Sequence, residues 1–419
     1  MIKNKKISII GAGIAGIATA ISLIEKGYKV EIFESKTNIG GRAGSINSKY
    51  GVMDIGQHIF LGTYKNFINI LKKLNVMGKI KINKNLYIPI IDNEKKYYIK
   101  SNFPYFPFSI LFAILGYKNL SLNNRFKVIY ALIKLRYLKE KNKDLNALNW
   151  LYKNKQNNET LTKFWSIICK PAFNQELEKI SIFQFNNLFE YMIFKPKQKI
   201  SICYLKEPFT KVLEKEFSEF LKKFNSKIFL GENINEIKIV DNKILLKGKK
   251  HTYEANNLIL ATNLDNALRL TNQKITKFQY TQSSIINIYY WFDNKIMTED
   301  FIAFTNSDLQ WVFSKNLKDK NIQKIVISLS DTDHLLKIKN KSLISDFEKK
   351  LREELKINEK IKTIKSKVIR SPKATQNLKK IKLNIHENIH FVGDWTMTDL
   401  PNTLESAAIS GVTLVKNQF

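Results

Sequence analysis

The hydrophobic pattern at the start of the chain alternates between short apolar runs and one longer segment. Residues 7–10 form an apolar run that stops at Gly11, and residues 17–26 have the small and apolar spacing of a packed helix. Residues 29–33 then form a second apolar run that ends at Glu34. Short apolar runs bounded by glycines are typical of buried strands, so the pattern predicts strand, helix and strand in order.

Later apolar runs predict further elements of both kinds, but no repeat and no linker rich in Gly, Ser or Pro separates them. This arrangement favours an α/β protein with interleaved domains. The pattern predicts a helix over residues 209–224, a helix opening near 403, and strands over 228–230, 234–240, 243–247, 258–262, 284–292, 310–313, 324–330 and 388–392.

The glycines between the first strand and helix have the spacing of a dinucleotide-binding turn. Gly11 permits the tight turn, Gly13 lets the backbone approach a pyrophosphate, and Gly16 lets helix and strand pack closely. The pyrophosphate would sit on the helix N-terminus, and Glu34 would accept hydrogen bonds from ribose hydroxyls. A glycine-rich turn of purely structural use is the alternative. The expected contacts in this region are Gly11, Gly13, Ile14, Ala15, Gly16, Glu34 and Ser35.

A second glycine motif indicates which dinucleotide is bound. Gly40-Gly41-Arg42, just past the second strand, resembles the extended fingerprint of flavoproteins of the amine-oxidase and phytoene-desaturase superfamily. The resemblance implies that Arg42 lies along the FAD pyrophosphate and that the glycines admit the cofactor. A surface salt bridge is the alternative role for Arg42. Because dehydrogenases that bind only NAD(P) have no reason to carry this second element, we predict FAD.

The carboxyl end resembles the matching half of such a flavin site. An apolar run ends in Gly393-Asp394, and in the superfamily an aspartate here hydrogen-bonds the ribityl chain. Pro401 and Thr403 are start signals for the last helix, whose first residues would include Leu404. The positive end of that helix would stabilise an anionic reduced flavin.

A closer resemblance comes from a block around residue 54. Asp54-Ile-Gly56-Gln57-His58, followed by Leu-Gly-Thr-Tyr64, and the C-terminal Gly-Asp-Trp-Thr and Leu-Pro blocks resemble hydroxysqualene dehydroxylases, a branch of the superfamily. The likeness is strong at both ends of the chain and thin across 200–385. Many relatives have Asn at position 55 and Gly at position 406, where this chain has Ile and Ser.

This resemblance implies a reductive dehydroxylation in which reduced FAD gives a hydride to an allylic carbon as water leaves. Such a reaction needs a proton donor for the hydroxyl, and the candidates are His58, Asp54 and Glu405. Each has a structural alternative: a flavin-packing or backbone-bonded role for His58, capping of a turn for Asp54, and support of a helix start for Glu405. Gly56 and Gln57 would lie at the flavin, with packing as the alternative role of Gln57.

The resemblance also implies an amine-oxidase-like architecture. We expect a discontinuous Rossmann-like FAD-binding domain and an interleaved α+β substrate-binding domain, with the backbone of Ile234 near adenine. The expected FAD-binding domain comprises residues 1–75, 196–265 and 385–419, and the expected substrate-binding or cap domain comprises 76–195 and 266–384.

The amino-acid composition limits the classes of binding partner that this protein can have. Ordinary proportions of 44% hydrophobic and 25% charged residues exclude disorder. The net charge of +32 comes from lysine far more than arginine, and there is no nucleic-acid-binding motif, so we expect no nucleic acid. Two cysteines without Cys-x-x-Cys spacing indicate no metal site and a reducing cytoplasm.

The most apolar stretch, residues 103–117, is too short to span a bilayer. It either lines a mouth for a polyisoprenoid substrate or forms a core helix. With the lysines from 118 to 141, it favours a peripheral contact with the inner face of the cytoplasmic membrane.

Two other functions stay open at this stage. One is another isoprenoid flavoenzyme, such as a carotenoid-type desaturase or isomerase. The other is a non-catalytic prenyl-lipid carrier of the dissociation-inhibitor type, which retention of Glu34, Arg42 and Asp394 disfavours. The sequence does not identify the physiological electron donor.

Overall fold

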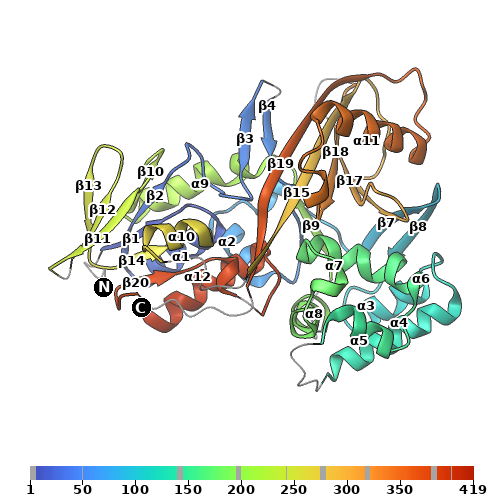
Figure 1. Ribbon diagram of the computed structural model, residues 1–419, viewed down its shortest axis with the longest axis horizontal. Coiled ribbons are helices and arrows are strands. Elements are labelled where there is room, and N and C mark those ends of the chain that lie inside the picture. The colour runs from blue at the N-terminus through green and yellow to red at the C-terminus, as the bar shows by residue number, and fades with distance from the viewer. Residues whose placement is uncertain are drawn as a thin grey trace.

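In the computed structural model the chain forms two adjoining lobes (Figure 1). One lobe is built around a parallel sheet and contains both chain ends, and the other combines a larger mixed sheet with a group of helices. The structure describes residues 6–419 apart from 50, 139–144, 195–199, 242, 274–279, 317–320, 379–384 and 398.

The parallel sheet has the strand order β10-β2-β1-β14-β20, and every neighbouring pair runs parallel. Most of its central residues are buried, as expected for a parallel sheet covered on both faces. The predicted α/β class is confirmed. The strands are β1 (Lys6–Ile10), β2 (Lys29–Glu34), β10 (Lys227–Leu230), β14 (Leu258–Leu260) and β20 (Ile389–Phe391).

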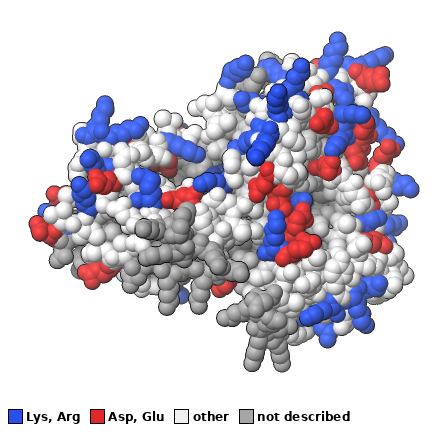
Figure 2. All heavy atoms as spheres, in the orientation of Figure 1, with Lys and Arg blue, Asp and Glu red and all other residues white. Residues whose placement is uncertain are grey.

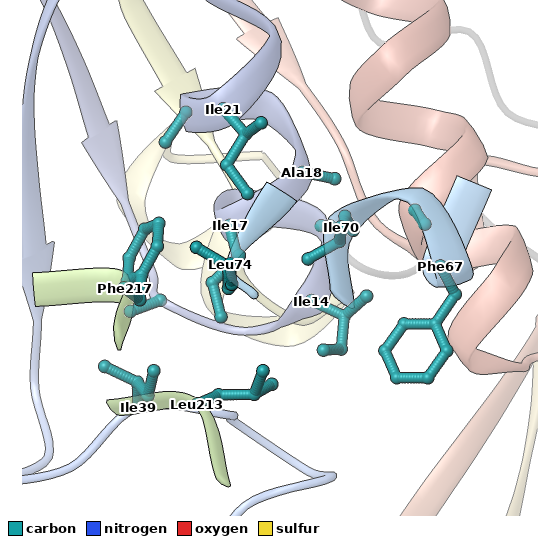
Figure 3. Close-up of a cluster of buried hydrophobic side chains, with 14 of the residues drawn as sticks. Ile14, Ile17, Ala18, Ile21, Ile39, Phe67, Ile70, Leu74, Leu213 and Phe217 are labelled. Carbon is teal, nitrogen blue, oxygen red and sulfur yellow. The ribbon is translucent and has the colours of Figure 1, made fainter. Parts of the chain in front are cut away.

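Helices cover this sheet, and their apolar side chains pack with those of the strands to form the hydrophobic core of this lobe. α1 (Ile14–Glu25) is buried along nearly its whole length because its side chains are small or apolar. Figure 3 shows Ile14, Ile17 and Ile21 of α1 among side chains of two neighbouring helices. The other helices of this lobe are α2 (Lys65–Lys73), α9 (Phe209–Lys223), α10 (Leu264–Leu270) and α12 (Leu404–Gln418).

A three-stranded antiparallel sheet lies beside the parallel one. It consists of β11 (Glu236–Val240), β12 (Lys243–Lys247) and β13 (Thr252–Ala255). The strand predicted to begin at Ile234 begins two residues later in the structure, at Glu236. Phe33 of β2 packs against Tyr253 of β13, with ring centroids 4.6 Å apart.

The second lobe contains a seven-stranded sheet of order β19-β15-β18-β17-β16-β7-β8. Its two longest strands, β15 (Tyr280–Phe292) and β19 (Thr363–Leu378), pair antiparallel and run from this lobe toward the parallel sheet (Figure 1). The others are β7 (Tyr87–Asp92), β8 (Lys95–Lys100), β16 (Phe301–Thr305), β17 (Trp311–Asn316) and β18 (Gln323–Ser330).

Helices pack on this sheet at two places. α11 (Asn340–Glu354) covers one face through Leu343, Phe347 and Leu351. A helical group rich in buried aromatic residues forms a separate core. It contains α3 (Phe108–Leu115), α4 (Leu122–Arg136), α5 (Ala147–Lys153), α6 (Asn158–Thr160), α7 (Ser166–Phe173) and α8 (Ile182–Phe189).

Two small sheets connect the lobes. One is the hairpin of β3 (Ser45–Ser48) and β4 (Gly51–Asp54). The other has the order β5-β9-β6, from β5 (Ile59–Leu61), β9 (Ile202–Leu205) and β6 (Ile80–Ile82). The residues 55–58 between β4 and β5 therefore lie where the lobes meet. The predicted domain boundaries stay a prediction, and those at 195/196 and 384/385 touch segments outside the described residues.

The stretch 103–117 becomes the short helix α3 and the loop before it. Ala113 and Ile114 are buried in the helical core, whereas Phe108 and Phe112 are exposed. The segment thus has a core side, as one of its two predicted roles requires, and an exposed outer side. The predicted role at a substrate mouth stays a prediction. Among the described residues, no helix has the length and apolarity that crossing a bilayer requires.

Candidate functional site

The glycine-rich turn sits against the end of β14 with no room for side chains. Gly11 has a φ of +106°, and a Cβ on it would lie 2.4 Å from the Ala261 carbonyl oxygen. A Cβ on Gly16 would lie 2.0 Å from the Gly11 carbonyl oxygen. These positions therefore require glycine, because any side chain would push β1, α1 and β14 apart.

α1 begins directly after this turn with an uncompensated positive end. Gly13 is its N-cap residue, no side chain caps the helix, and its first turn contains no acidic residue. Free N–H groups and the helix dipole make such an end favourable for an anion. The first helical residues Ile14 and Ala15 are buried, so any anion would be bound by backbone groups.

The second glycine motif faces Gly13. Gly13 and Gly40 form a parallel backbone bridge, and Gly41, with φ of +58°, would bring a Cβ within 3.2 Å of the Gly13 Cα. A Cβ on Gly13 itself would meet nothing nearer than the Gly41 Cα at 3.9 Å. Two backbones without side chains thus leave room for a group as large as a pyrophosphate to approach closely.

Glu34 is held at the end of β2. Its Oε2 accepts a hydrogen bond from the Ala12 backbone N–H at 2.8 Å, and its Oε1 accepts from Lys36 N at 2.9 Å and from the Ser35 hydroxyl. Oε2 retains a lone pair that could accept a ribose hydroxyl. Ile234 is buried in a cluster with Ile10 and Phe33, at the same end of these strands.

Arg42 and Asp394 form an ion pair that joins the two predicted halves of the site across 352 positions of sequence. Arg42 also donates to the Ala374 carbonyl at 2.9 Å, and the Asp394 carboxylate, which is buried, accepts from Trp395 N at 3.0 Å. Arg42 therefore does form a salt bridge, and its partner is the other predicted cofactor residue.

The start of α12 explains the serine at position 406. Thr403 is the N-cap residue, and its hydroxyl accepts from Ser406 N at 3.2 Å while the Ser406 hydroxyl accepts from Thr403 N at 2.8 Å. This capping box satisfies two backbone donors. Ser406 also donates to the Pro401 carbonyl at 2.8 Å, which fixes the chain that enters the helix just before Leu404.

Two of the three candidate proton donors cap helices. The Glu405 carboxylate accepts from Asn66 N at 3.0 Å and from Phe67 N at 2.9 Å, which caps α2. Asp54 Oδ1 accepts from Phe209 N at 2.8 Å, at the start of α9, and from the hydroxyl of Ser45. Both carboxylates thus have structural roles, as the alternatives proposed, but Glu405 supports the start of α2 instead of its own helix, and Asp54 caps a helix instead of a turn. These contacts make a role in proton transfer less favourable for both residues.

His58 is placed differently. Its ring hydrogen-bonds the Ala43 backbone and packs edge-on against Phe209, with ring centroids 5.9 Å apart. Nε2 is buried and has no hydrogen-bond partner among the described residues, and a Cβ on Gly56 would lie 3.6 Å from it. Burial lowers the pKa of His58, the nearby Asp54 carboxylate opposes the shift, and Lys315 adds to it. The imidazole is therefore neutral at pH 7, with one nitrogen free to bind a partner.

Gln57 is tied to a group that the sequence did not single out. Its Nε2 donates to the Tyr289 hydroxyl at 3.0 Å, and that hydroxyl donates to the Asp54 carbonyl at 2.6 Å. Lys315 Nζ lies 3.7 Å from Asp54 Oδ2. β15 and β17 thus support the segment that carries His58 from the other lobe. Apolar strands give little sign of such a role, because the contacts span more than 230 positions.

Lys324 of β18 is a half-buried cation beside this cluster. Its Nζ lies 5.9 Å from the Tyr289 ring centroid. Burial lowers the pKa of Lys324 to about 8, Lys315 lowers it too, and Asp54 opposes both. The sequence feature that could have pointed to this residue is a lysine within a strand whose central residues are mostly apolar.

Comparisons with known proteins agree with this geometry. The sequence pattern of the family described as flavin containing amine oxidoreductase matches residues 14–416. The chain belongs to this family. It is therefore a flavin-dependent oxidoreductase with FAD as its cofactor, and the predicted cofactor and enzyme class are confirmed.

Curated relatives of this flavin amine oxidoreductase include carotenoid desaturases. A zeta-carotene desaturase of Capsicum annuum is 46% identical over 70 residues, which is 16% of this chain and 12% of that protein. A 15-cis-phytoene desaturase of Narcissus pseudonarcissus is 21% identical and covers 98% of this chain and 78% of its own length. This chain spans only 12% to 50% of the zeta-carotene desaturases from Capsicum annuum and Synechocystis.

Solved structures confirm the amine-oxidase-like fold. An oxidoreductase from Methanosarcina mazei superposes with a TM-score of 0.77 at 15% identity, over 98% of this chain and 100% of that one. A putrescine oxidase bound to putrescine has a TM-score of 0.74 at 12% identity, over 99% of each chain.

The residues present fit FAD. The uncapped end of α1 and the side-chain-free backbones of Gly13 and Gly41 are features that a bound dinucleotide would explain. Gly13 and Gly41 would flank the pyrophosphate, with Glu34 at the ribose and Asp394 at the ribityl chain. Among the described residues, no group of three or more His, Cys, Asp or Glu could hold a metal ion.

Replacing Gly13 with valine should abolish FAD retention without unfolding the protein. Little of the protein stands where the Gly13 Cβ would be placed, so the added side chain would take up the space of the pyrophosphate. The flavin absorbance of the purified variant and the melting temperatures of both apo forms measure the two effects. Gly78→Val is the matched control, because a Cβ there meets nothing within 4 Å and no cofactor contact is expected. Full flavin retention by Gly13→Val would contradict the assignment.

Lys324→Met should stabilise the protein at pH 7 by on the order of 1 kcal/mol or more, because it removes a charge that burial disfavours. The folded pKa of about 8 lies below the unfolded value of 10.5, so between these values the unfolded chain binds more protons. Wild-type stability should therefore rise as pH increases from 8 to 10.5, and the variant should lose this rise. Urea unfolding at several pH values measures both effects. Lys227→Met, at an exposed position of β10, is the control. Equal pH dependence in Lys324→Met and wild type would contradict the prediction.

Proposed function

We propose that this flavin oxidoreductase carries out the reductive dehydroxylation of hydroxysqualene to squalene. The C–O bond of the allylic alcohol breaks, a C–H bond forms, and the hydroxyl leaves as water after taking up one proton. Reduced FAD, when bound, supplies the hydride and is oxidised. The blocks around His58 and Asp394 that resemble hydroxysqualene dehydroxylases support this proposal, and the kinship with desaturases of long polyenes supports an isoprenoid substrate.

The observation that carries the proposal is the buried Nε2 of His58, which has no hydrogen-bond partner among the described residues. Of the three candidate donors, Asp54 and Glu405 are engaged at the starts of α9 and α2, whereas His58 has an unpartnered nitrogen. A neutral imidazole there can first accept a hydrogen bond from the substrate hydroxyl. When protonated by a proton taken up from solvent, it can donate that proton to the hydroxyl oxygen, so that water leaves as the C–O bond breaks.

The surrounding residues affect how readily His58 is protonated and how its segment is held. Asp54 favours protonation of His58, whereas burial and Lys315 oppose it. Tyr289 and Gln57 hold the segment on which His58 stands. Water would be excluded from a carbocation by the apolar faces that meet here, including Met53 and Trp291.

A carotenoid-type desaturase is the second candidate, favoured by the similarity of this chain to zeta-carotene and phytoene desaturases. In that reaction a polyene would lose hydrogen to the oxidised cofactor. The non-catalytic carrier is set aside because the family is one of oxidoreductases.

The proposal is tested by anaerobic reduction of the FAD-loaded protein with dithionite, followed by removal of excess reductant and addition of hydroxysqualene. Flavin reoxidation with one squalene formed per flavin is the expected result. A fully FAD-loaded protein that stays reduced would contradict the dehydroxylation. Reduction of the oxidised protein by a polyene would then support the desaturase.

His58→Ala should lower turnover about a hundredfold or more while the protein retains FAD, since general acid catalysis contributes at least this much. Because the pKa of His58 lies below 6.5, wild-type turnover should rise as pH falls from 7 toward that pKa. The variant should lose this acid-side rise. Rates across pH measure both effects, and His334→Ala, a histidine outside the site, is the control. Turnover that is unchanged in His58→Ala would remove His58 from the mechanism.

A further inference from the structure

The exposed apolar side chains of this protein are concentrated in one segment. Of the seventeen large hydrophobic side chains that are exposed among the described residues, nine lie between residues 103 and 137. Single exposed apolar residues are ordinary, but such a concentration marks a contact surface. The nine are Phe103, Tyr105, Phe108, Phe112, Leu122, Phe126, Tyr130, Ile133 and Tyr137.

α4 has two apolar faces. Its inner face, with Val128, Ala131, Leu132 and Leu135, is buried in the helical core. The outer face repeats at intervals of four, four, three and four residues from Leu122 to Tyr137, which places these side chains on one side of the helix. Exposure there ranges from 36% at Tyr130 to 75% at Tyr137. Packing against the core requires only the first face, so the fold does not account for the second.

α3 adds a cluster of aromatic rings next to α4. Phe103 stacks on Phe112 with ring centroids 4.5 Å apart, and Phe108 lies 6.4 Å from Phe112. The other side of α3 anchors this cluster through Ala113 and Ile114 in the core. The rings are thus held outward by a packed helix.

The same segment is free of negative charge. Residues 95–138 contain six lysines, two arginines and no aspartate or glutamate. Three carboxylates from elsewhere reach it, and all three are engaged: Glu299 by Lys96, Glu159 by Ser121 and Asn124, and Glu190 by Arg136.

The lysines beside the outer face of α4 have charges that remain available to a binding partner. Within the described part of the chain, Lys118, Lys127 and Lys134 form no ion pair. Lys134 and Lys155 lie 5.6 and 5.3 Å from the Tyr130 ring, so cations flank the apolar stripe. Blue and white side chains predominate at the lower right of Figure 2, where Figure 1 places α4 to α6.

We propose that the outer faces of α3 and α4 dock onto the surface of an anionic lipid bilayer. Aromatic and aliphatic side chains would enter the boundary between headgroups and acyl chains, and the lysines would meet the anionic headgroups. A second copy fits less well, because it would bring two acid-free cationic surfaces together. A nucleic acid would leave the apolar stripe without a matching surface.

Vesicle flotation with the full-length, FAD-loaded protein tests this proposal and uses no substrate, so its result is independent of the proposed reaction. The probes are phosphatidylcholine vesicles with and without phosphatidylglycerol. We expect binding to the anionic vesicles to exceed binding to the neutral ones about tenfold or more, and to fall when ionic strength reaches about 1 M. No binding to anionic vesicles would overturn the proposal.

Matched variants locate the surface. Phe126→Ser with Ile133→Ser should weaken vesicle binding about tenfold or more, and Lys127→Gln with Lys134→Gln should weaken it at low salt. The controls are Ile239→Ser with Val240→Ser, at equally exposed positions of β11, and Lys222→Gln with Lys227→Gln. FAD content and melting temperature show that each variant is folded. Equal loss in the controls, or a protein dimer that the α4 substitutions dissociate, would overturn the proposal.

Discussion

The close approach of backbones at the glycines is the constraint on which the rest of this structure depends. Gly11 lies against the carbonyl of Ala261, Gly16 lies against Gly11, and Gly41 lies against Gly13. These contacts bring three chain segments, around residues 11–16, 41 and 261, to one place. The same principle operates at Gly411, where a Cβ would lie 2.5 Å from the Thr19 hydroxyl, so that α12 packs directly on α1. The cofactor site is thus built mainly from backbone.

Acidic side chains then fix the helices around that site. Glu405 on α12 caps α2, Asp54 at the end of β4 caps α9, and Asp394 pairs with Arg42. Each contact joins segments that are far apart in sequence and replaces water at a buried donor, where an unsatisfied group would be costly. Because these carboxylates are used in this way, His58 is the candidate proton donor that keeps a nitrogen without a hydrogen-bond partner.

The excess of lysine serves different roles in different regions of the protein. Many lysines form ion pairs on the surface, and Lys324 is half-buried beside Lys315 and Asp54. In the segment that carries α3 and α4, by contrast, the cations surround an outward apolar surface and acids are absent. Net charge alone therefore says little about partners, whereas its arrangement relative to apolar side chains is informative.

The sequence by itself determined the parallel sheet and the dinucleotide turn, because these depend on short-range patterns: buried strands of a few residues, and glycines wherever a side chain would clash. The FAD cofactor followed from the resemblance of Gly40-Gly41-Arg42 to a flavoprotein motif. The sequence also placed Thr403 correctly at the start of α12. Only the tertiary structure decided what Asp54, Glu405 and Arg42 do, since their partners Phe209, Phe67 and Asp394 lie more than 150 positions away. The outer apolar face of α4 could not be recognised from the sequence for a related reason. A helix with apolar residues on two sides has weak amphipathic character, and burial of one side against the core is what distinguishes the other.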